Sequence, residues 1–259
     1  MSLHRFFLDN QVLAQETAEE FALRLSPDDF KHARVLRLQA GEHIAVIDAS
    51  TDYFECEVVS FDDDLRVRIC SHEHVDEDGA QVILLQGLAK GDKFDEVVRH
   101  ATEIGVAAFI PLICERSVVK LDEKKAAARV ERWENVAKSA AMQAGLRSIP
   151  EIAEPVSIED AVAMVSGATC VLVAWEEAGK LTIKEALEST LAATQTLPED
   201  ARVAVAVGPE GGLTEAEVKR FVSAHDYAFA VTLGPNILRT ETAGLIAPAI
   251  AIYELGGLQ

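Results

Sequence analysis

The 259-residue chain has few cysteines and no long apolar run. The four cysteines are scattered and form no C-x-x-C pair, standing at Cys56, Cys70, Cys114 and Cys170. This spacing disfavours a zinc site or a disulfide framework and is typical of reduced, buried thiols. No apolar run approaches the roughly 18 residues of a membrane-spanning helix, and the first residues lack a signal-peptide pattern. We therefore expect a cytoplasmic protein with no metal and no membrane segment.

Basic residues are also scarce, since 24 Lys and Arg stand against 43 Asp and Glu and the formal net charge is -19. Such a charge disfavours a nucleic-acid partner, because phosphate contacts need Lys and Arg. One stretch reverses the sign: residues 115–147 contain eight basic and five acidic side chains. Judged by charge alone, this stretch is typical of a solvated helix face with spaced opposite charges.

Residues 1–72 have the pattern of a small β domain. Short runs rich in β-branched and aromatic residues are separated by turn formers and so predict several strands. These runs cover residues 43–48, 53–60 and 65–70. Ser26 followed by Pro27 predicts a helix start, as N-cap and first helical residue. The arrangement favours a small barrel, and we expect the acidic stretch 71–79 to be a linker.

From residue 73 onward the pattern changes to that of an α/β domain. Nearly continuous apolar runs, typical of strands covered on both faces, alternate with segments of helical spacing. The expected strands are 82–88, 107–113, 170–175, 202–207 and 229–233, and the expected helices are 92–104, 123–144, 158–165, 183–193, 215–224 and 241–255. This alternation predicts a mainly parallel sheet.

The first motif that carries chemistry is a glycine loop, GPEGG at residues 208–212, between a predicted strand and a predicted helix. Thr214 and Glu217 have the spacing of a capping box, which marks the helix start. Glycines permit close backbone approach to a ligand, and open α/β sheets bind ligands at the carboxyl ends of their strands. The loop lacks both G-x-G-x-x-G and the Lys-Ser/Thr of a phosphate loop. A ligand site and a tight structural turn are therefore both open.

A second strand ends in a Gly-Pro loop, LGPNILRTETA at residues 233–243, and a helix follows with Thr240 as its expected cap. Arg239 and Glu241 stand there among apolar residues, a pattern that suits a ligand with a flat heterocycle and a charged end. The alternative is an ordinary capped helix with an Arg–Glu surface pair. Two such loops after consecutive strands favour a ligand site of unspecified chemistry.

Together these motifs resemble the RsmE family of small-subunit (16S) rRNA uridine-N3 methyltransferases, within the SPOUT superfamily. The two loop motifs are the most specific ones of that family, and both are intact. Shorter matches extend the resemblance over nearly the whole chain, at residues 4–7, 32–38, 90–93, 101–106, 115–118 and 132–133. The segment QAGLR at 143–147 departs from the family pattern Gln-Ser-Gly-Arg at Ala144 and Leu146.

The resemblance implies a PUA-like, RNA-binding β-barrel over residues 1–72 and a SPOUT methyltransferase domain over residues 73–259, an α/β domain with a parallel sheet and a C-terminal trefoil knot. It also implies a homodimer with the methyl-donor site at the subunit interface. The cofactor would be S-adenosyl-L-methionine and the partner 16S rRNA, within a small-subunit particle. The residues implied to hold the cofactor are Gly208, Pro209, Glu210, Gly211, Gly212, Leu233, Gly234, Ile237, Leu238, Arg239 and Thr240. A third, more loosely defined contact would follow residues 171–176.

The implied reaction moves a methyl group from a sulfonium to N3 of one uridine, after the N3 proton has left. The enzyme has to align the reacting atoms and stabilise negative charge on the uracil oxygens. Arg239 is the expected stabilising group, because a guanidinium can fork onto an oxygen. Glu241 would accept the proton or orient Arg239, the alternative being a structural role at a helix start. The residues implied to hold RNA phosphates are Arg5, Arg34, Arg37, Arg116 and Arg147.

Two functions of other classes stay open. One is a non-enzymatic RNA-binding protein that has kept the SPOUT scaffold, which the intact loops disfavour. The other is a small-molecule α/β transferase, with which the charge of -19 is compatible. Binding of S-adenosylmethionine tests the first alternative, and the nature of the methylated product tests the second.

Overall fold

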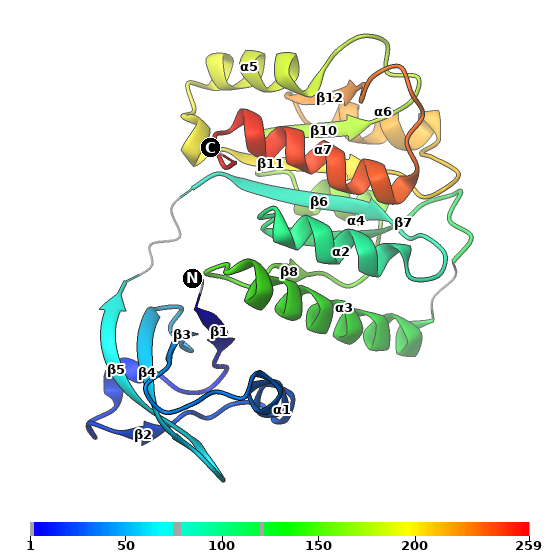
Figure 1. Ribbon diagram of the computed structural model, residues 1–259. Coiled ribbons are helices and arrows are strands. Elements are labelled where there is room, and N and C mark those ends of the chain that lie inside the picture. Colours follow the sequence, from blue (N-terminus) through cyan, green and yellow to red (C-terminus); the bar gives the residue numbers. More distant parts are fainter. Residues whose placement is uncertain (1–2, 75–78, 120–121, 259) are drawn as a thin grey trace. The chain divides into compact units, whose positions relative to one another are not determined.

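The computed structural model describes residues 3–74, 79–119 and 122–258. The chain divides into two compact units (Figure 1). The first unit comprises Met1–Glu77 with Ala141–Ser148, and the second comprises Asp78–Ala140 with Ile149–Gln259.

The first unit contains a five-stranded sheet in the order β1-β3-β4-β5-β2. β1 pairs with β3 in parallel, and the other neighbouring strands are antiparallel. Its elements are β1 (His4–Phe7), η1 (Leu13–Gln15), β2 (Phe21–Ala22), α1 (Pro27–Leu36), β3 (His43–Ile47), β4 (Tyr53–Phe61) and β5 (Leu65–Glu73). Alternation along β4 buries Phe54, Cys56 and Val58, as expected for a strand with one face on a core.

Two local predictions for this unit have different outcomes. The helix start is confirmed, because α1 begins at Pro27 and the Ser26 hydroxyl accepts a hydrogen bond from the Asp29 amide at 3.1 Å. The linker start is wrong, because β5 continues to Glu73, where it pairs with Tyr53 of β4. Residues 75–78 of the expected linker lie outside the described residues.

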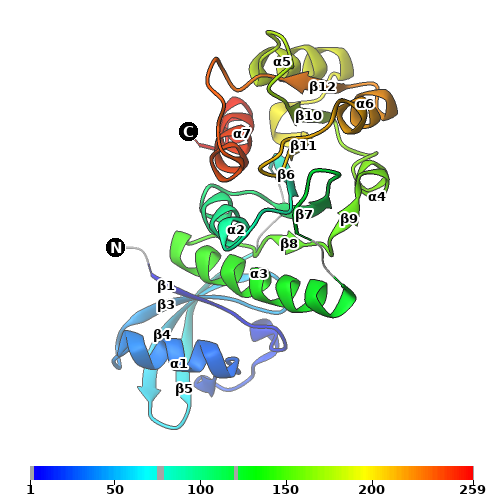
Figure 2. The same cartoon turned by 90° about the vertical axis from the view of Figure 1, so that its right-hand side faces the viewer.

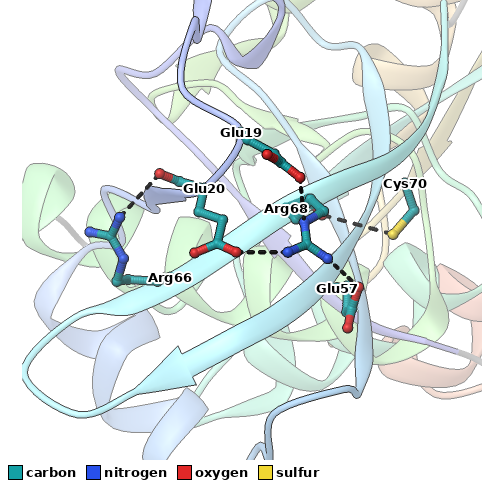
Figure 3. A network of polar contacts seen from close by, with 6 residues as sticks. All are labelled: Glu19, Glu20, Glu57, Arg66, Arg68 and Cys70. Atoms are coloured by element: carbon teal, nitrogen blue, oxygen red, sulfur yellow. Dashed lines mark hydrogen bonds and ion pairs between the residues drawn. The ribbon is translucent and has the colours of Figure 1, made fainter.

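A charged network surrounds Arg68 of β5 (Figure 3). Its guanidinium lies 2.7 Å from Glu20, 3.4 Å from Glu57 and 3.6 Å from Glu19. These carboxylates raise the pKa of Arg68, chiefly through the hydrogen bond to Glu20. Exposed pairs of this kind add little stability. One of the seven basic side chains of residues 1–72 is thereby occupied within the protein.

The second unit is an α/β domain built on a seven-stranded sheet, in the order β12-β10-β11-β6-β7-β8 with β9 beside β7. Every strand pairing found in it is parallel, which confirms the predicted α/β domain with a mainly parallel sheet. The strands are β6 (Gln81–Gly87), β7 (Ala108–Ile113), β8 (Glu151–Ile152), β9 (Val156–Ser157), β10 (Cys170–Ala174), β11 (Arg202–Val207) and β12 (Ala228–Val231). The helices are α2 (Lys93–Glu103), α3 (Glu123–Ala144), α4 (Ile158–Met164), α5 (Ile183–Thr194), η2 (Pro198–Asp200), α6 (Glu215–Ala224) and α7 (Thr240–Glu254).

Helices cover both faces of this sheet (Figure 2). On one face α7 packs between α2 and α5, and on the other face α4 packs against α6. Each face has its own hydrophobic core, which explains why a central strand such as β11 is buried at Val203–Val207. Because β6, β10, β11 and β12 are parallel, the loops that follow them start at the same edge of the sheet.

Candidate active site

A cavity of about 380 Å³ lies at the carboxyl ends of β10, β11 and β12. All eleven residues predicted to hold a cofactor line it, so the structure brings both loop motifs to one place. Ala174, Trp175 and Glu176 also line it, and they belong to the run 171–176 after which a third contact is expected. The remaining lining residues are Lys93, Val207, Leu213, Thr232, Pro235, Asn236 and Ala243.

The glycine loop has little room for side chains. A Cβ on Gly208 would lie 2.7 Å from the Leu213 amide nitrogen, a distance that real Cβ atoms do not adopt. Gly212 has φ +69, and a Cβ there would lie 2.9 Å from Oε1 of Glu176. The Gly212 amide also donates to the Pro209 carbonyl at 2.9 Å, which closes a tight turn. Glycine is therefore required here both by close contact and by conformation.

The helix that follows the loop begins as predicted. The Thr214 hydroxyl accepts from the Glu217 amide and the Glu217 carboxylate accepts from the Thr214 amide, so the capping box is confirmed. Oε1 of Glu217 also accepts a hydrogen bond from the Glu115 amide at 2.8 Å. This buried carboxylate therefore joins the glycine loop to the segment that follows β7.

Thr240 is not the helix cap that the sequence predicts. The N-cap of α7 is Arg239, and no side chain caps that helix. The Thr240 hydroxyl donates instead to the Gly208 carbonyl at 2.6 Å and accepts from Nε2 of Gln86 at 2.9 Å. It is a buried link between the two loop motifs, and Gln86 is a residue to which the motifs assign no role. One sequence feature marks Gln86, because it is the single amide side chain in the apolar run 82–88.

Lys93 of α2 connects the acidic groups of the two loops. Its Nζ lies 3.2 Å from Oε1 of Glu210 and 3.3 Å from Oε2 of Glu241. The Lys90 amide also donates to Oε1 of Glu210, at 3.0 Å. The hydrogen bond with Glu210 is the main cause of a raised pKa at Lys93. Burial acts to raise the pKa of Glu210, but hydrogen bonds from backbone amides and from Lys93 outweigh it and the pKa is lowered.

Arg239 and Ile237 are among the exposed residues of the second loop. The Ile237 side chain is 87% exposed. Arg239 is exposed too, and its guanidinium forms no hydrogen bond or ion pair with the residues described between 3 and 258. A cation at a cavity wall that is unpaired within this part of the chain is available to a ligand.

Among the arginines predicted to hold RNA phosphates, Arg116 lies in the second unit. Its Nη1 donates to the carbonyls of Gly211 and Leu213, at 3.0 and 3.5 Å. The nearby basic stretch is partly neutralised, because Lys125 pairs with Asp122 and Arg132 pairs with two aspartates of the segment 92–95. Lys120 of this stretch lies outside the described residues.

The other four predicted RNA-binding residues lie in the first unit. The Arg5 guanidinium donates to the carbonyls of Gly145 and Leu146, and burial lowers its pKa. Arg147 pairs with Glu73 at 3.0 Å, and both Arg5 and Arg147 lie over the Tyr53 ring, 5.5 and 5.6 Å from its centroid. Arg34 and Arg37 are both exposed. The Arg34 guanidinium lies 5.0 Å from the Phe30 ring centroid, and Arg37 is the left-handed C-cap of α1.

The cysteines differ in exposure. Cys56, Cys114 and Cys170 are buried, as predicted, whereas Cys70 on β5 is exposed. Burial raises the pKa of Cys56 and Cys114 to about 12 and that of Cys170 to about 11. Within the described ranges, no group of three or more His, Cys, Asp and Glu side chains is placed to hold a metal ion. No helix among the described residues has the length and apolar character needed to cross a membrane.

Residues 76–252 match the family model described as an RNA methyltransferase domain. The Ribosomal RNA small subunit methyltransferase E of Bacillus subtilis is 34% identical over 97% of either chain. A solved methyltransferase of Legionella pneumophila, in complex with the cofactor SAM, is 26% identical and aligns over 98% of both chains with a TM-score of 0.79. The Ribosomal RNA small subunit methyltransferase E of Neisseria gonorrhoeae, bound to S-adenosyl methionine, is 27% identical and aligns over 96% of both with a TM-score of 0.76.

Proposed function

Because the chain belongs to the RNA methyltransferase family and is similar over its length to the Ribosomal RNA small subunit methyltransferases E, we propose that it methylates N3 of one uridine in 16S rRNA. The methyl donor is S-adenosyl-L-methionine. One observation carries this proposal: both loop motifs and the end of β10 form the wall of a single cavity.

The wall suits the proposed donor in size and chemistry. The volume of about 380 Å³ falls within the range of small-molecule sites. Leu233, Ile237 and Leu238 offer apolar surface to a flat heterocycle, and the glycine loop offers backbone amides and carbonyls. Glu176 and Arg239 add one carboxylate and one guanidinium, which match a ligand that carries charges of both signs. The eleven predicted residues are therefore our proposed donor site.

When bound, S-adenosylmethionine supplies an electrophilic methyl group. Arg239 is proposed to stabilise the negative charge that develops on a uracil oxygen, since its guanidinium is exposed at the cavity wall. Glu241 is proposed as the acceptor of the N3 proton, and the ion pair with Lys93 holds its carboxylate in place. The alternative role of Glu241 is structural, because its ion pair with Lys93 joins α7 to α2.

We propose the SPOUT form of the fold for residues 73–259, with a C-terminal trefoil knot. Its support is the hydrogen bond from Thr240 to Gly208, which holds the start of α7 against the loop after β11. For residues 1–72 we propose a PUA-like, RNA-binding barrel, supported by the mixed sheet with β1 parallel to β3. In this unit Arg5, Arg34, Arg37 and Arg147 are the proposed phosphate contacts.

A homodimer is proposed from the surface of α7. A helix that is apolar on all sides is normally buried, yet α7 has exposed apolar side chains at Ile246 and Tyr253, opposite its buried Ala247 and Ala251. A second copy of this chain is the occupant we propose, because α7 starts at the cavity and the family resemblance implies a donor site at a subunit interface. Light scattering on the purified protein tests this: a monomeric mass at micromolar concentration would contradict it.

A methyl-transfer experiment tests the proposed activity. The purified protein is incubated with labelled S-adenosylmethionine and with free 16S rRNA or small-subunit particles, and the modified nucleotide is mapped by mass spectrometry. We expect label at N3 of a single uridine, with particles as the better substrate, and loss of that modification in cells that lack the gene. Donor binding without transfer to RNA would indicate a small-molecule transferase. Absence of donor binding in calorimetry would indicate a non-enzymatic RNA-binding protein. We propose a cytoplasmic location in either case, because the rRNA is found there.

A further inference from the structure

Arg116 lies against the glycine loop along its whole side chain. Its Nη1 donates to the Gly211 carbonyl at 3.0 Å and reaches the Leu213 carbonyl at 3.5 Å. At the other end of the side chain, a Cβ built on Gly211 would lie only 2.9 Å from the Cβ of Arg116. Contact therefore extends from the Arg116 backbone to its guanidinium, and it involves the loop that lines the cavity.

The backbone beside Arg116 is held to the same loop by a second, independent link. The Glu115 amide donates to Glu217 at 2.8 Å, and the other oxygen of that carboxylate accepts from the Thr214 amide at 2.7 Å. The segment is itself a closed turn, because the Ser117 amide donates to the Cys114 carbonyl at 3.0 Å. Arg116 therefore projects from a fixed turn onto a loop that is anchored at its helical end.

The loop needs such support because three of its five residues are glycine. A glycine has more backbone freedom to lose than any other residue, and ordering one residue costs about 1–2 kcal/mol. A loop that is ordered before its ligand arrives saves that cost at binding. A charged donor on two carbonyls fixes the peptide planes of Gly211 and Leu213, on either side of Gly212.

We propose that Arg116 is a positioning residue for the methyl-donor loop and acts on donor affinity, in place of the phosphate contact that the resemblance implies. This inference rests on the proposed function, because it takes the cavity to be the donor site. Through the loop, Arg116 influences a ligand that it does not touch, since it is not part of the cavity wall.

The test compares Arg116→Ala and Arg116→Lys with the control Arg99→Ala. Arg99 is an exposed residue of α2 for which no side-chain interaction is found among the described residues. Calorimetry with S-adenosylmethionine, in the absence of RNA, gives the donor Kd. Loss of a hydrogen bond from a charged donor predicts a rise of about tenfold for Arg116→Ala. The donor Kd of Arg116→Lys should fall between those of Arg116→Ala and the wild type, because lysine keeps a charged donor but its ammonium is a compact, strongly hydrated charge on a differently shaped side chain. The donor Kd of Arg99→Ala should equal that of the wild type.

Steady-state kinetics separate this role from a general loss of structure. For Arg116→Ala we expect the KM for the donor to rise with its Kd, while the KM for RNA and the kcat at saturating donor stay within about twofold of the wild type. An unchanged donor Kd with a raised RNA KM would overturn the inference and return Arg116 to the phosphate. If Arg116→Ala does not fold, Arg116→Lys decides, because it keeps a charge that a phosphate would accept. A wild type that binds no donor at all would instead refute the proposed function.

Discussion

Replacing Gly212 by alanine separates backbone strain from contact in the cavity wall. Gly212 has φ +69, a conformation that costs a residue with a Cβ about 1–2 kcal/mol. The new Cβ would also lie 2.9 Å from Oε1 of Glu176, where ordinary contacts begin at 3.4 Å, so the loop or the carboxylate has to move by about half an ångström. We expect a melting temperature lowered by on the order of 5 °C and a donor Kd raised at least about tenfold.

Gly179→Ala is the matched control for this change. Gly179 has φ +66, nearly the same conformation, but a Cβ there would meet nothing within 4 Å, and the residue is not part of the cavity wall. Gly179→Ala should lower the melting temperature as much as Gly212→Ala does, but it should leave the donor Kd at the wild-type value. When Glu176 is replaced by alanine, the clash with the new Cβ is removed. Gly212→Ala should therefore raise the donor Kd by less in the Glu176→Ala background than in the wild type. Equal donor affinity of Gly212→Ala and Gly179→Ala in calorimetry would refute the reasoning.

Three further predictions concern the groups that join the two loops. Thr240→Val leaves the Gly208 carbonyl and the Gln86 amide without their shared partner, which should cost about 1–3 kcal/mol in denaturant unfolding; Thr240→Ser, which keeps the hydroxyl, should not. Glu210 has a lowered pKa, so its contribution to stability is present above its ordinary pKa and is lost as the pH falls through the folded-state value; the melting temperature of Glu210→Gln should therefore fall less steeply than that of the wild type between pH 5 and pH 3, about the range in which a carboxyl titrates. Arg239→Ala should lower kcat at saturating donor by about 10²–10³-fold, and unchanged turnover would remove Arg239 from the mechanism.

Elements with strong local signals were predictable to within a residue. β11 and α6 have the predicted bounds, because a continuous apolar run marks the strand and the Thr214–Glu217 pair marks the helix start. β8 and β9 were not predictable from the sequence, because each has two residues, which are too few for a periodic pattern. The extension of β5 to Glu73 depends on pairing with β4, which the acidic composition of that stretch does not reveal.

The candidate site was predictable as a set of loops but not as a network. Both motifs follow parallel strands, so their meeting at one edge follows from the fold class alone. The contacts of Gln86 with Thr240 and of Lys93 with Glu241 join residues about 150 positions apart in the chain. No local spacing encodes such pairs, and for the same reason the contact of Nη1 of Arg116 with the glycine loop is a finding of the structure.

An RNA substrate is compatible with a net charge of -19 where phosphates meet local cations. Electrostatic affinity depends on the number of phosphates neutralised by nearby cations, so distant carboxylates that lie beyond the Debye length matter little. Several cations of residues 115–147 are already occupied within the protein, such as Arg116, Arg132 and Arg147. Under the proposed function, RNA affinity then depends less on this stretch than its eight basic residues suggest. Selection of one uridine has to come from the cavity, where Arg239 offers a cation that is unpaired among the described residues.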